Sequence, residues 1–167
     1  ASDDLVAGTR ARARQVMTIY GGLTVLGAAL LWLSGASPFD ALLHALTAVS
    51  TGGFSTHGDS AAGLGGRAVQ AALILLCLAG AISFSLQHRA VRGDPLALLR
   101  DHELHALLLA AAVTCGLVLL AESAAPASAS PGSAADAAFL ALSAQTTAGF
   151  GTTEVANLTP ASKLALI

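Results

Sequence analysis

The stretch that decides the fold reads Ser37-Pro38-Phe39-Asp40-Ala41-Leu42-Leu43-His44-Ala45-Leu46-Thr47-Ala48-Val49-Ser50-Thr51-Gly52-Gly53-Phe54-Ser55-Thr56. Its start is typical of a helix N-terminus, because Pro38 suits a first helical turn and Asp40 places a carboxylate at the positive end of the helix. A mostly apolar run follows and stops at Gly52-Gly53, where glycine permits backbone geometry that other residues resist. The stretch therefore predicts a short helix that runs into a special loop.

The same pattern returns 96 residues later, where residues 133–154 read SAADAAFLALSAQTTAGFGTTE. Laid without gaps on residues 37–58, this segment matches at ten of 22 positions. Alanine matches carry little weight in a chain this rich in alanine. The aligned Asp40 and Asp136 and the shared Thr-x-Gly-Phe-x-Thr carry most of the likeness. A spacing this long indicates a duplicated unit rather than a solenoid of short repeats.

The composition indicates a membrane protein. Of the 167 residues, 54% are hydrophobic and 11% are charged, against about 25% charged in an ordinary soluble domain. The mean hydropathy is +0.71. A net charge of -2 gives no reason to expect nucleic acid as a partner. Cys77 and Cys115 each lie inside an apolar run and are interpreted as small buried hydrophobic residues.

Three runs are long enough to cross a bilayer, which takes about 20 apolar residues. Residues 15–33 carry no charge, and Trp32 stands near their far end, where an interfacial indole is expected. The other two predicted membrane helices cover about residues 68–88 and 104–121. The segments 38–50 and 135–146 reach only about 20 Å, at ~1.5 Å per residue, and are predicted to be half-helices. Irregular backbone at membrane depth is tolerated only where protein buries it or it lines a wet cavity, so the loops 51–55 and 147–151 are candidate functional segments.

The fold class predicted is therefore an all-α membrane protein made of repeated units, each a membrane helix, a half pore helix, a filter loop and a membrane helix. The first unit covers residues 1–103 and the second, truncated unit covers residues 104–167. Residues 160–167 are expected to begin a further membrane helix that continues in a longer chain. Residues 87–103 are expected to form a charged connector on the water side, and residues 122–133 a flexible external loop.

Charge predicts the orientation. Six of the eight Lys and Arg residues flank the side where the first membrane helix starts and the second ends, and Arg67 and Lys163 fall on the other side. The positive-inside rule places the six in the cytoplasm. Arg92 is then cytoplasmic, Ser128 is external and both loops open to the outside. The six residues are Arg10, Arg12, Arg14, Arg89, Arg92 and Arg100.

The chain resembles the Trk/Ktr/HKT superfamily of potassium transporters, and within it the bacterial TrkH-type membrane subunits. The residues that carry the resemblance are Phe39-Asp40, the run Gly52 to His57, Arg100-Asp101 and the run Thr146 to Phe150. The resemblance covers nearly the whole chain. It implies two of the four repeats of such a subunit, a homodimer in the bacterial inner membrane, and a cytoplasmic nucleotide-binding regulator of the TrkA type.

The resemblance also implies the site. The backbone carbonyls of the filter residues would replace the water around a potassium ion, no cofactor or enzymatic activity is expected, and Phe54 and Phe150 would pack behind the filter. Ser55 stands where potassium channels have a second glycine, and Ser55→Gly is expected to change transport little. Asp40 and Asp136 are predicted to cap the half-helices. The filter residues implied are Thr51, Gly52, Gly53, Thr147, Ala148 and Gly149.

Two other functions stay open on the sequence. One is the potassium-translocating subunit of a P-type ATPase complex, which has similar repeats. The other is a membrane scaffold that conducts no ion, which leaves the doubled loops unexplained. His44 is interpreted as a packing residue of its half-helix, and His57 and Asp59 as solvated residues near the outer mouth.

Overall fold

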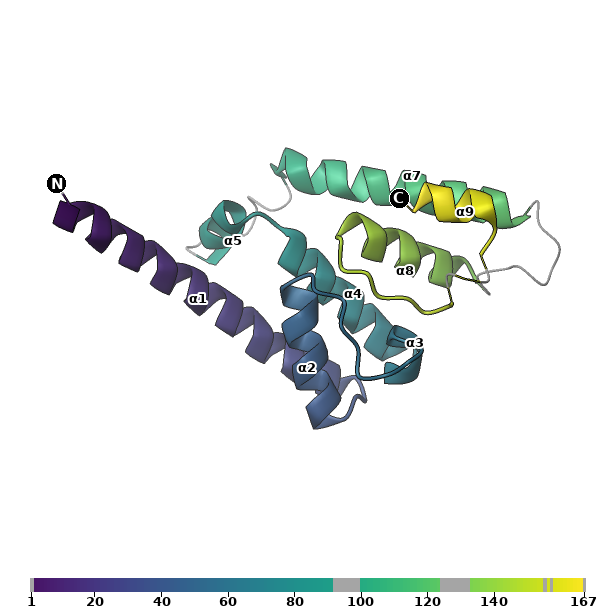
Figure 1. The fold of residues 1–167 in the computed structure, drawn as a ribbon, viewed down its shortest axis with the longest axis horizontal. Helices are drawn as coiled ribbons and strands as arrows, with labels where there is room; N and C mark the ends of the chain where they lie inside the picture. Colours follow the sequence, from purple (N-terminus) through teal and green to yellow (C-terminus); the bar gives the residue numbers. More distant parts are fainter. Residues whose placement is uncertain (1, 92–99, 124–132, 155, 157, 167) are drawn as a thin grey trace.

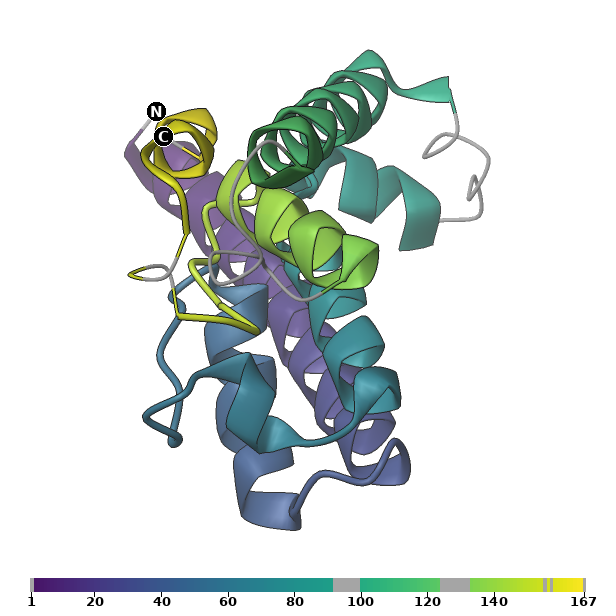
Figure 2. The ribbon, with the colours of Figure 1, turned by 90° about the vertical axis from the view of Figure 1, so that its right-hand side faces the viewer.

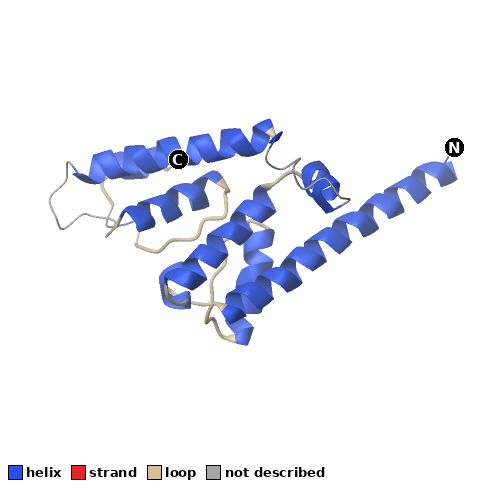
Figure 3. Ribbon diagram, turned by 180° about the vertical axis from the view of Figure 1, so that it is seen from behind, coloured by secondary structure: helices blue, strands red, loops and turns tan. Residues whose placement is uncertain are grey.

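The computed structural model describes residues 2–91, 100–123, 133–154, 156 and 158–166. Every regular element among these residues is a helix (Figure 3). The helices are α1 (Ser2–Leu33), α2 (Pro38–Val49), α3 (Ala61–Leu64), α4 (Arg67–Ala81), α5 (Phe84–Val91), α7 (His102–Ser123), α8 (Ala134–Gln145) and α9 (Pro160–Ala165).

The first unit is built around the short helix α2. In Figure 1, α2 turns back beside the end of α1, and the loop after α2 returns alongside it to α3 and α4. The second unit repeats this arrangement, because α8 lies against α7 and the loop after α8 returns beside α8 toward α9. α8 also contacts α4, so the two units share a boundary between their inner helices, as Figure 2 shows in the turned view.

Two helices are long and apolar enough to cross a membrane, namely Arg12–Leu33 of α1 and His102–Ser123 of α7. Large apolar side chains on α1 are exposed, for example Leu26 at 70% and Leu33 at 81%. A surface of this kind is suited to lipid rather than to water. α1 begins well before the uncharged segment 15–33, because a helix can continue past the membrane boundary into a charged stretch.

The predicted second membrane helix, residues 68–88, is wrong as a single continuous helix. α4 ends at Ala81, and Ile82 has an extended backbone with φ -67° and ψ 137° before α5 starts at Phe84. The Nε2 amide of Gln87 donates to the carbonyls of Ala79 and Ile82 at 2.7 and 3.0 Å. The buried Gln87 side chain thereby satisfies carbonyls that the end of α4 would leave without a partner.

Residues 92–99 of the predicted connector and residues 124–132 of the predicted external loop lie outside the described residues, and Arg92 and Ser128 are among them. Glu122 belongs to α7 rather than to a loop and is 7% exposed. Its Oε1 accepts hydrogen bonds from the backbone N–H and the hydroxyl of Thr159 and from the hydroxyl of Ser162, at 3.1, 3.0 and 2.5 Å. Glu122 therefore ties the end of α7 to the start of α9.

The core contains small residues that let the helices approach closely. Ala41, Ala45 and Ala48 of α2 are at most 1% exposed. A Cβ added to Gly80 of α4 would lie 2.5 Å from the carbonyl oxygen of Val49, so only glycine allows α4 to pass this close to the end of α2. The core cluster extends to Ala148 and Phe150 of the second unit and so fixes the second loop against the first half-helix.

Candidate functional site

The two loops have the same backbone conformation. Thr51 and Gly53 have φ of 51° and 68°, and the aligned Thr147 and Gly149 have φ of 56° and 77°. Gly52 and Ala148, which lie between them, do not have positive φ. A β-branched residue at positive φ is a strained conformation that persists only where the surroundings impose it. The same strain at equivalent positions of both units makes the two loops candidate functional segments.

This alternation explains which glycine is repeated. Position 53 and its counterpart 149 need the left-handed region, which glycine adopts at little cost. Position 52 does not need it, and its counterpart is Ala148. The glycines that the loop backbone needs for positive φ are therefore Gly53 and Gly149, which stand directly before the two phenylalanines.

The N–H groups at the start of each loop point back to the half-helix that precedes them. Thr51 and Gly52 donate to the carbonyls of Ala48 and Thr47 at 3.1 and 2.7 Å. In the second loop, the equivalent N–H groups of residues 147 and 148 donate to the carbonyls of residues 144 and 143 at 2.9 and 3.0 Å. Among the hydrogen bonds of the described residues, none is accepted by a carbonyl of residues 51–53 or 147–149. Each loop is thus anchored through its donors, and its acceptors remain available to a cation.

The two loops also meet. A Cβ added to Gly53 would overlap the carbonyl oxygen of Ala148 in the opposite loop. Further along, the N–H of Ala61 donates to the carbonyl of Gly151 at 2.9 Å, and the N–H of Gly151 donates to Oγ of Ser60 at 3.2 Å. The first unit therefore holds the second loop through both backbone groups of Gly151, beyond the filter residues.

The half-helices begin with serine caps. The hydroxyl oxygen of Ser37 accepts a hydrogen bond from the N–H of Asp40 at 3.1 Å, and Ser133 does the same for Asp136 at 3.3 Å. The prediction that the aspartates are the caps is therefore corrected, because each aspartate stands three residues inside the cap. From there each carboxylate accepts a hydrogen bond from its own cap hydroxyl at 2.7 Å.

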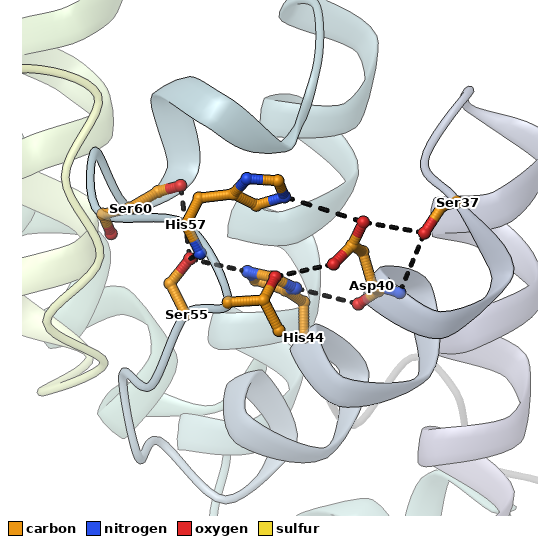
Figure 4. A network of polar contacts seen from close by, with 7 residues as sticks. Ser37, Asp40, His44, Ser55, His57 and Ser60 are labelled. Carbon is orange, nitrogen blue, oxygen red and sulfur yellow. Dashed lines mark hydrogen bonds and ion pairs between the residues drawn. The ribbon is translucent and has the colours of Figure 1, made fainter.

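Asp40 joins the start of α2 to the segment after the first loop. Its Oδ1 accepts a hydrogen bond from the Thr56 hydroxyl at 2.6 Å, and its Oδ2 lies 3.6 Å from Nε2 of His57 (Figure 4). The hydrogen bonds from Thr56 and Ser37 lower the pKa of Asp40 below its ordinary value. His57 is therefore not merely solvated as predicted, because it helps to hold the chain back against the half-helix.

Asp136 is held by a residue of the other unit. Arg67, at the start of α4, donates from both terminal nitrogens to the Asp136 carboxylate at 2.6 and 3.0 Å. The Arg67 hydrogen bond is the main cause that lowers the pKa of Asp136 to about 2, against the opposing effect of burial. A planar guanidinium that grips a carboxylate in this way fixes direction as well as distance, so Arg67 sets the position of α8 relative to α4.

His44 and Ser55 form a second cluster, which the sequence did not reveal. The fully buried ring of His44 binds the Asp40 carbonyl through Nδ1 at 2.8 Å and the Ser55 hydroxyl through Nε2 at 2.9 Å (Figure 4). Ser55 Oγ also accepts from the N–H of His57 at 3.1 Å and lies 3.3 Å from the Ser60 carbonyl. A histidine eleven residues before a serine has no recognisable spacing, so only the folded loop shows the contact.

The two phenylalanines differ. Phe150 is 2% exposed and its ring lies 6.0 Å from the ring of His44, so it packs on the half-helix of the other unit. Phe54 is 78% exposed. The prediction that both pack behind the loops therefore describes Phe150 but not Phe54 in this chain.

A hollow of about 350 Å³ lies between the second loop and residues 58–62 of the first unit. Gly149 and Gly151 of the second loop line it, together with the carboxylate-bearing residues Asp59 and Glu154. The negative side chains at this hollow raise the local concentration of cations next to the loop carbonyls.

These features define an all-helical membrane protein with repeated pore-helix units. The chain belongs to the family described as TrkH, cation transport protein, which it matches over residues 3–167. It is 41% identical over 112 residues to the Trk system potassium uptake protein TrkI of Halomonas elongata, an alignment that covers 65% of this chain and 22% of the relative. It is 33% identical over 152 residues to the Trk system potassium uptake protein TrkH of Vibrio parahaemolyticus, covering 87% of this chain and 31% of the relative.

The fold agrees with a solved structure. The crystal structure of the potassium transporter TrkH from Vibrio parahaemolyticus superposes with a TM-score of 0.75 at 28% identity, over 94% of this chain and 34% of that one. The chain thus spans between about a fifth and a third of the length of the proteins it matches.

Proposed function

We propose that the protein carrying this chain takes up potassium ions across the bacterial cytoplasmic membrane, through a pore in which residues 51–53 and 147–149 form part of the selectivity filter. The observation that carries the proposal is the pair of matching loops. The first two N–H groups of each loop are bonded to the half-helix before it, and the carbonyls of residues 51–53 and 147–149 accept no hydrogen bond among the described residues. A potassium ion loses its hydration shell only where oxygen atoms replace the water, and rings of backbone carbonyls do this in potassium-selective pores.

The half-helices support the same role. α2 and α8 both end at the loops, so the negative ends of both helices lie next to the carbonyls. A helix C-terminus carries a partial negative charge of about half an electron, which favours a cation. Because the same polarity is repeated in both units, the electrostatic contributions of the two half-helices add.

Two loops are part of a ring. Gly53 lies against Ala148 of the next loop, and Phe150 packs on His44 of the preceding half-helix. If Phe54 packs in the same way as Phe150, the exposed Phe54 ring lies against the half-helix of a further repeat. We therefore propose that additional repeats of the same subunit complete the ring, with a homodimer and a cytoplasmic regulator of the TrkA type as further partners.

The relatives favour this function over the two alternatives that the sequence left open. Those with assigned roles are named as Trk system potassium uptake proteins, which favours a Trk-type uptake pore over the ATPase-associated subunit. A scaffold that conducts no ion gives no reason for strained threonines at equivalent positions of two loops. Potassium is the transported substrate, and the chemistry needs no cofactor.

The test is potassium uptake by the full-length protein in cells that lack their own potassium uptake. The cells are expected to grow at low potassium and to accumulate radioactive rubidium, with less inhibition by sodium than by potassium. A Gly53→Ser, Gly149→Ser double variant at equal membrane expression is expected to lose this preference. Normal membrane expression without growth rescue or rubidium uptake would support a scaffold instead.

A further inference from the structure

His44 links the first half-helix to both loops, and its counterpart in the second unit cannot. The position aligned with His44 is Leu140, and the position aligned with Ser55 is Gly151. Leucine has no hydrogen-bonding group, and glycine has no hydroxyl. The His44–Ser55 contact is therefore confined to one unit, although the loop backbone is the same in both.

The geometry limits where the protons in this cluster can be. Nδ1 of His44 lies 2.8 Å from the Asp40 carbonyl, which can only accept, so Nδ1 carries a hydrogen. Ser55 Oγ already accepts from the N–H of His57, and its single proton has two acceptors within reach. These acceptors are Nε2 of His44 at 2.9 Å and the Ser60 carbonyl at 3.3 Å.

The protonation state of His44 decides between these two acceptors. In the neutral ring, Nε2 has no hydrogen and accepts the Ser55 proton. In the charged ring, Nε2 donates to Ser55 Oγ, and the Ser55 hydroxyl turns to the Ser60 carbonyl. The two states differ at the Ser60 carbonyl, which accepts the Ser55 proton only when the ring is charged. A proton added to the ring therefore rotates the Ser55 hydroxyl.

Ser60 passes this change to the second loop. The Ser60 side chain accepts from the N–H of Gly151, and the next residue, Ala61, donates to the Gly151 carbonyl. Ser60 itself has φ 57° and ψ -128°, a conformation that a non-glycine residue rarely adopts. A change in the hydrogen bond to the Ser60 carbonyl therefore acts on a strained residue that holds the second loop.

We propose that His44 is a positioning residue for both filter loops, acting through the Ser55 hydroxyl and Ser60, and that it makes ion preference depend on pH. The inference rests on the proposed function and adds a regulating residue to that same site. Histidine is the side chain whose ordinary charge change falls between about pH 5 and 8. Protonation strengthens the Ser55–Ser60 hydrogen bond, draws residues 55–60 together and shifts the anchor of Gly151.

The other charged groups around His44 can be named. His57 stacks on the ring at 6.3 Å, and the Asp40 carboxylate lies on the same helix and faces Thr56 and His57. The packed segment of α1 is uncharged over residues 15–33, and α4 carries one charged residue, Arg67, which is bound to Asp136. The second loop contributes Phe150. His57 is therefore the other histidine in contact with His44 and needs its own control.

The experiment compares rubidium uptake and its inhibition by sodium from pH 5 to pH 8, in cells that express the full-length protein or its variants. The wild type is expected to change its rubidium-to-sodium preference by about threefold to tenfold, the range that one net hydrogen bond provides. His44→Gln keeps a polar contact without titrating, and Ser55→Ala removes the rotating hydroxyl, so both variants are expected to show a flat profile. His57→Gln is the control and is expected to keep the wild-type profile. Melting temperatures check that each variant is folded.

The outcomes separate the inference from the proposed function. A pH profile that persists in His44→Gln, or that disappears in His57→Gln alone, would overturn the role of His44. Rubidium uptake in the wild type without pH dependence would also overturn it and would leave the proposed function standing. Absence of uptake at every pH would overturn both.

Discussion

The substitution Gly53→Ala tests whether the loop backbone itself performs the selection. Gly53 has φ 68°, and its added Cβ would overlap the Ala148 carbonyl of the opposite loop. A left-handed conformation costs a residue with a Cβ about 1–2 kcal/mol, and overpacking adds about 1–3 kcal/mol. Gly53→Ala is therefore expected to destabilise the loop pair by about 2–5 kcal/mol and to displace a carbonyl that would face the ion.

Gly52→Ala is the matched control one residue away. Gly52 does not have positive φ, and its added Cβ would lie 3.3 Å from the Ser50 hydroxyl, a side chain that can move slightly. The aligned residue of the second loop is already Ala148. Glycine to alanine at a compatible backbone position is neutral or stabilises by about 0.4–1 kcal/mol, so this variant should behave as the wild type.

The assay is competitive potassium and sodium uptake at equal membrane expression, together with the melting temperature of the purified full-length protein. Gly53→Ala is expected to lower the melting temperature and to reduce the preference for potassium, whereas Gly52→Ala is expected to change neither. Equal behaviour of the two variants would refute the argument, because it would show that neither the sign of φ nor the contact with Ala148 matters.

Three further predictions concern the supports of the loops. Asp136 has a pKa of about 2 in the folded protein against an ordinary 3.8, so its contribution to stability is complete above about pH 4 and is lost as pH falls toward 2. Asp136→Asn should therefore flatten the acid end of a curve of stability against pH. A curve that is unchanged in that region would count against the Arg67–Asp136 ion pair. Gly80→Ala should destabilise by about 1–3 kcal/mol, because its Cβ would lie 2.5 Å from the Val49 carbonyl oxygen, and thermal unfolding that matches the wild type would contradict this packing. Glu122→Leu should destabilise the protein by about 2–4 kcal/mol, because it leaves buried donors of residues 159 and 162 without their acceptor. Glu122→Gln should destabilise the protein less. Equal melting temperatures for both variants and the wild type would show that Glu122 does not hold α9.

The sequence was sufficient for the repeat, the half-helices and the position of the loops. These depend on local signals, namely Pro38 with Asp40 at a helix start, apolar runs of two distinct lengths, and glycine after each short run. The place of Gly53 and Gly149 directly before a phenylalanine indicates positive φ there, whereas nothing in the sequence indicates the positive φ of Thr51 and Thr147. An aspartate at a helix start suggests a cap, but Ser37 and Ser133 stand three residues before Asp40 and Asp136 and suit that role as well.

Other features depend on contacts that the sequence does not show. The break after Ala81 falls inside an apolar run that contains no Pro, and the neighbouring Gly80 is equally expected where membrane helices pack closely. The compensating Gln87 acts from the following helix. Nothing in the sequence connects His44 with Ser55, so the sequence alone predicts that Ser55→Gly changes transport little. The structure changes that expectation, because Ser55 Oγ is bonded to His44 and to the N–H of His57.

The most direct measurement is the location of the ion in the full-length protein. Crystals grown with potassium and then exchanged into rubidium or thallium would show the ion by anomalous scattering. We predict anomalous peaks bounded by the carbonyl oxygens of residues 51–53 and 147–149, and loss of these peaks in Gly53→Ala but not in Gly52→Ala. Peaks elsewhere in the membrane region, with no ion between the loops of a protein that still takes up potassium, would contradict the assignment of these loops as the filter.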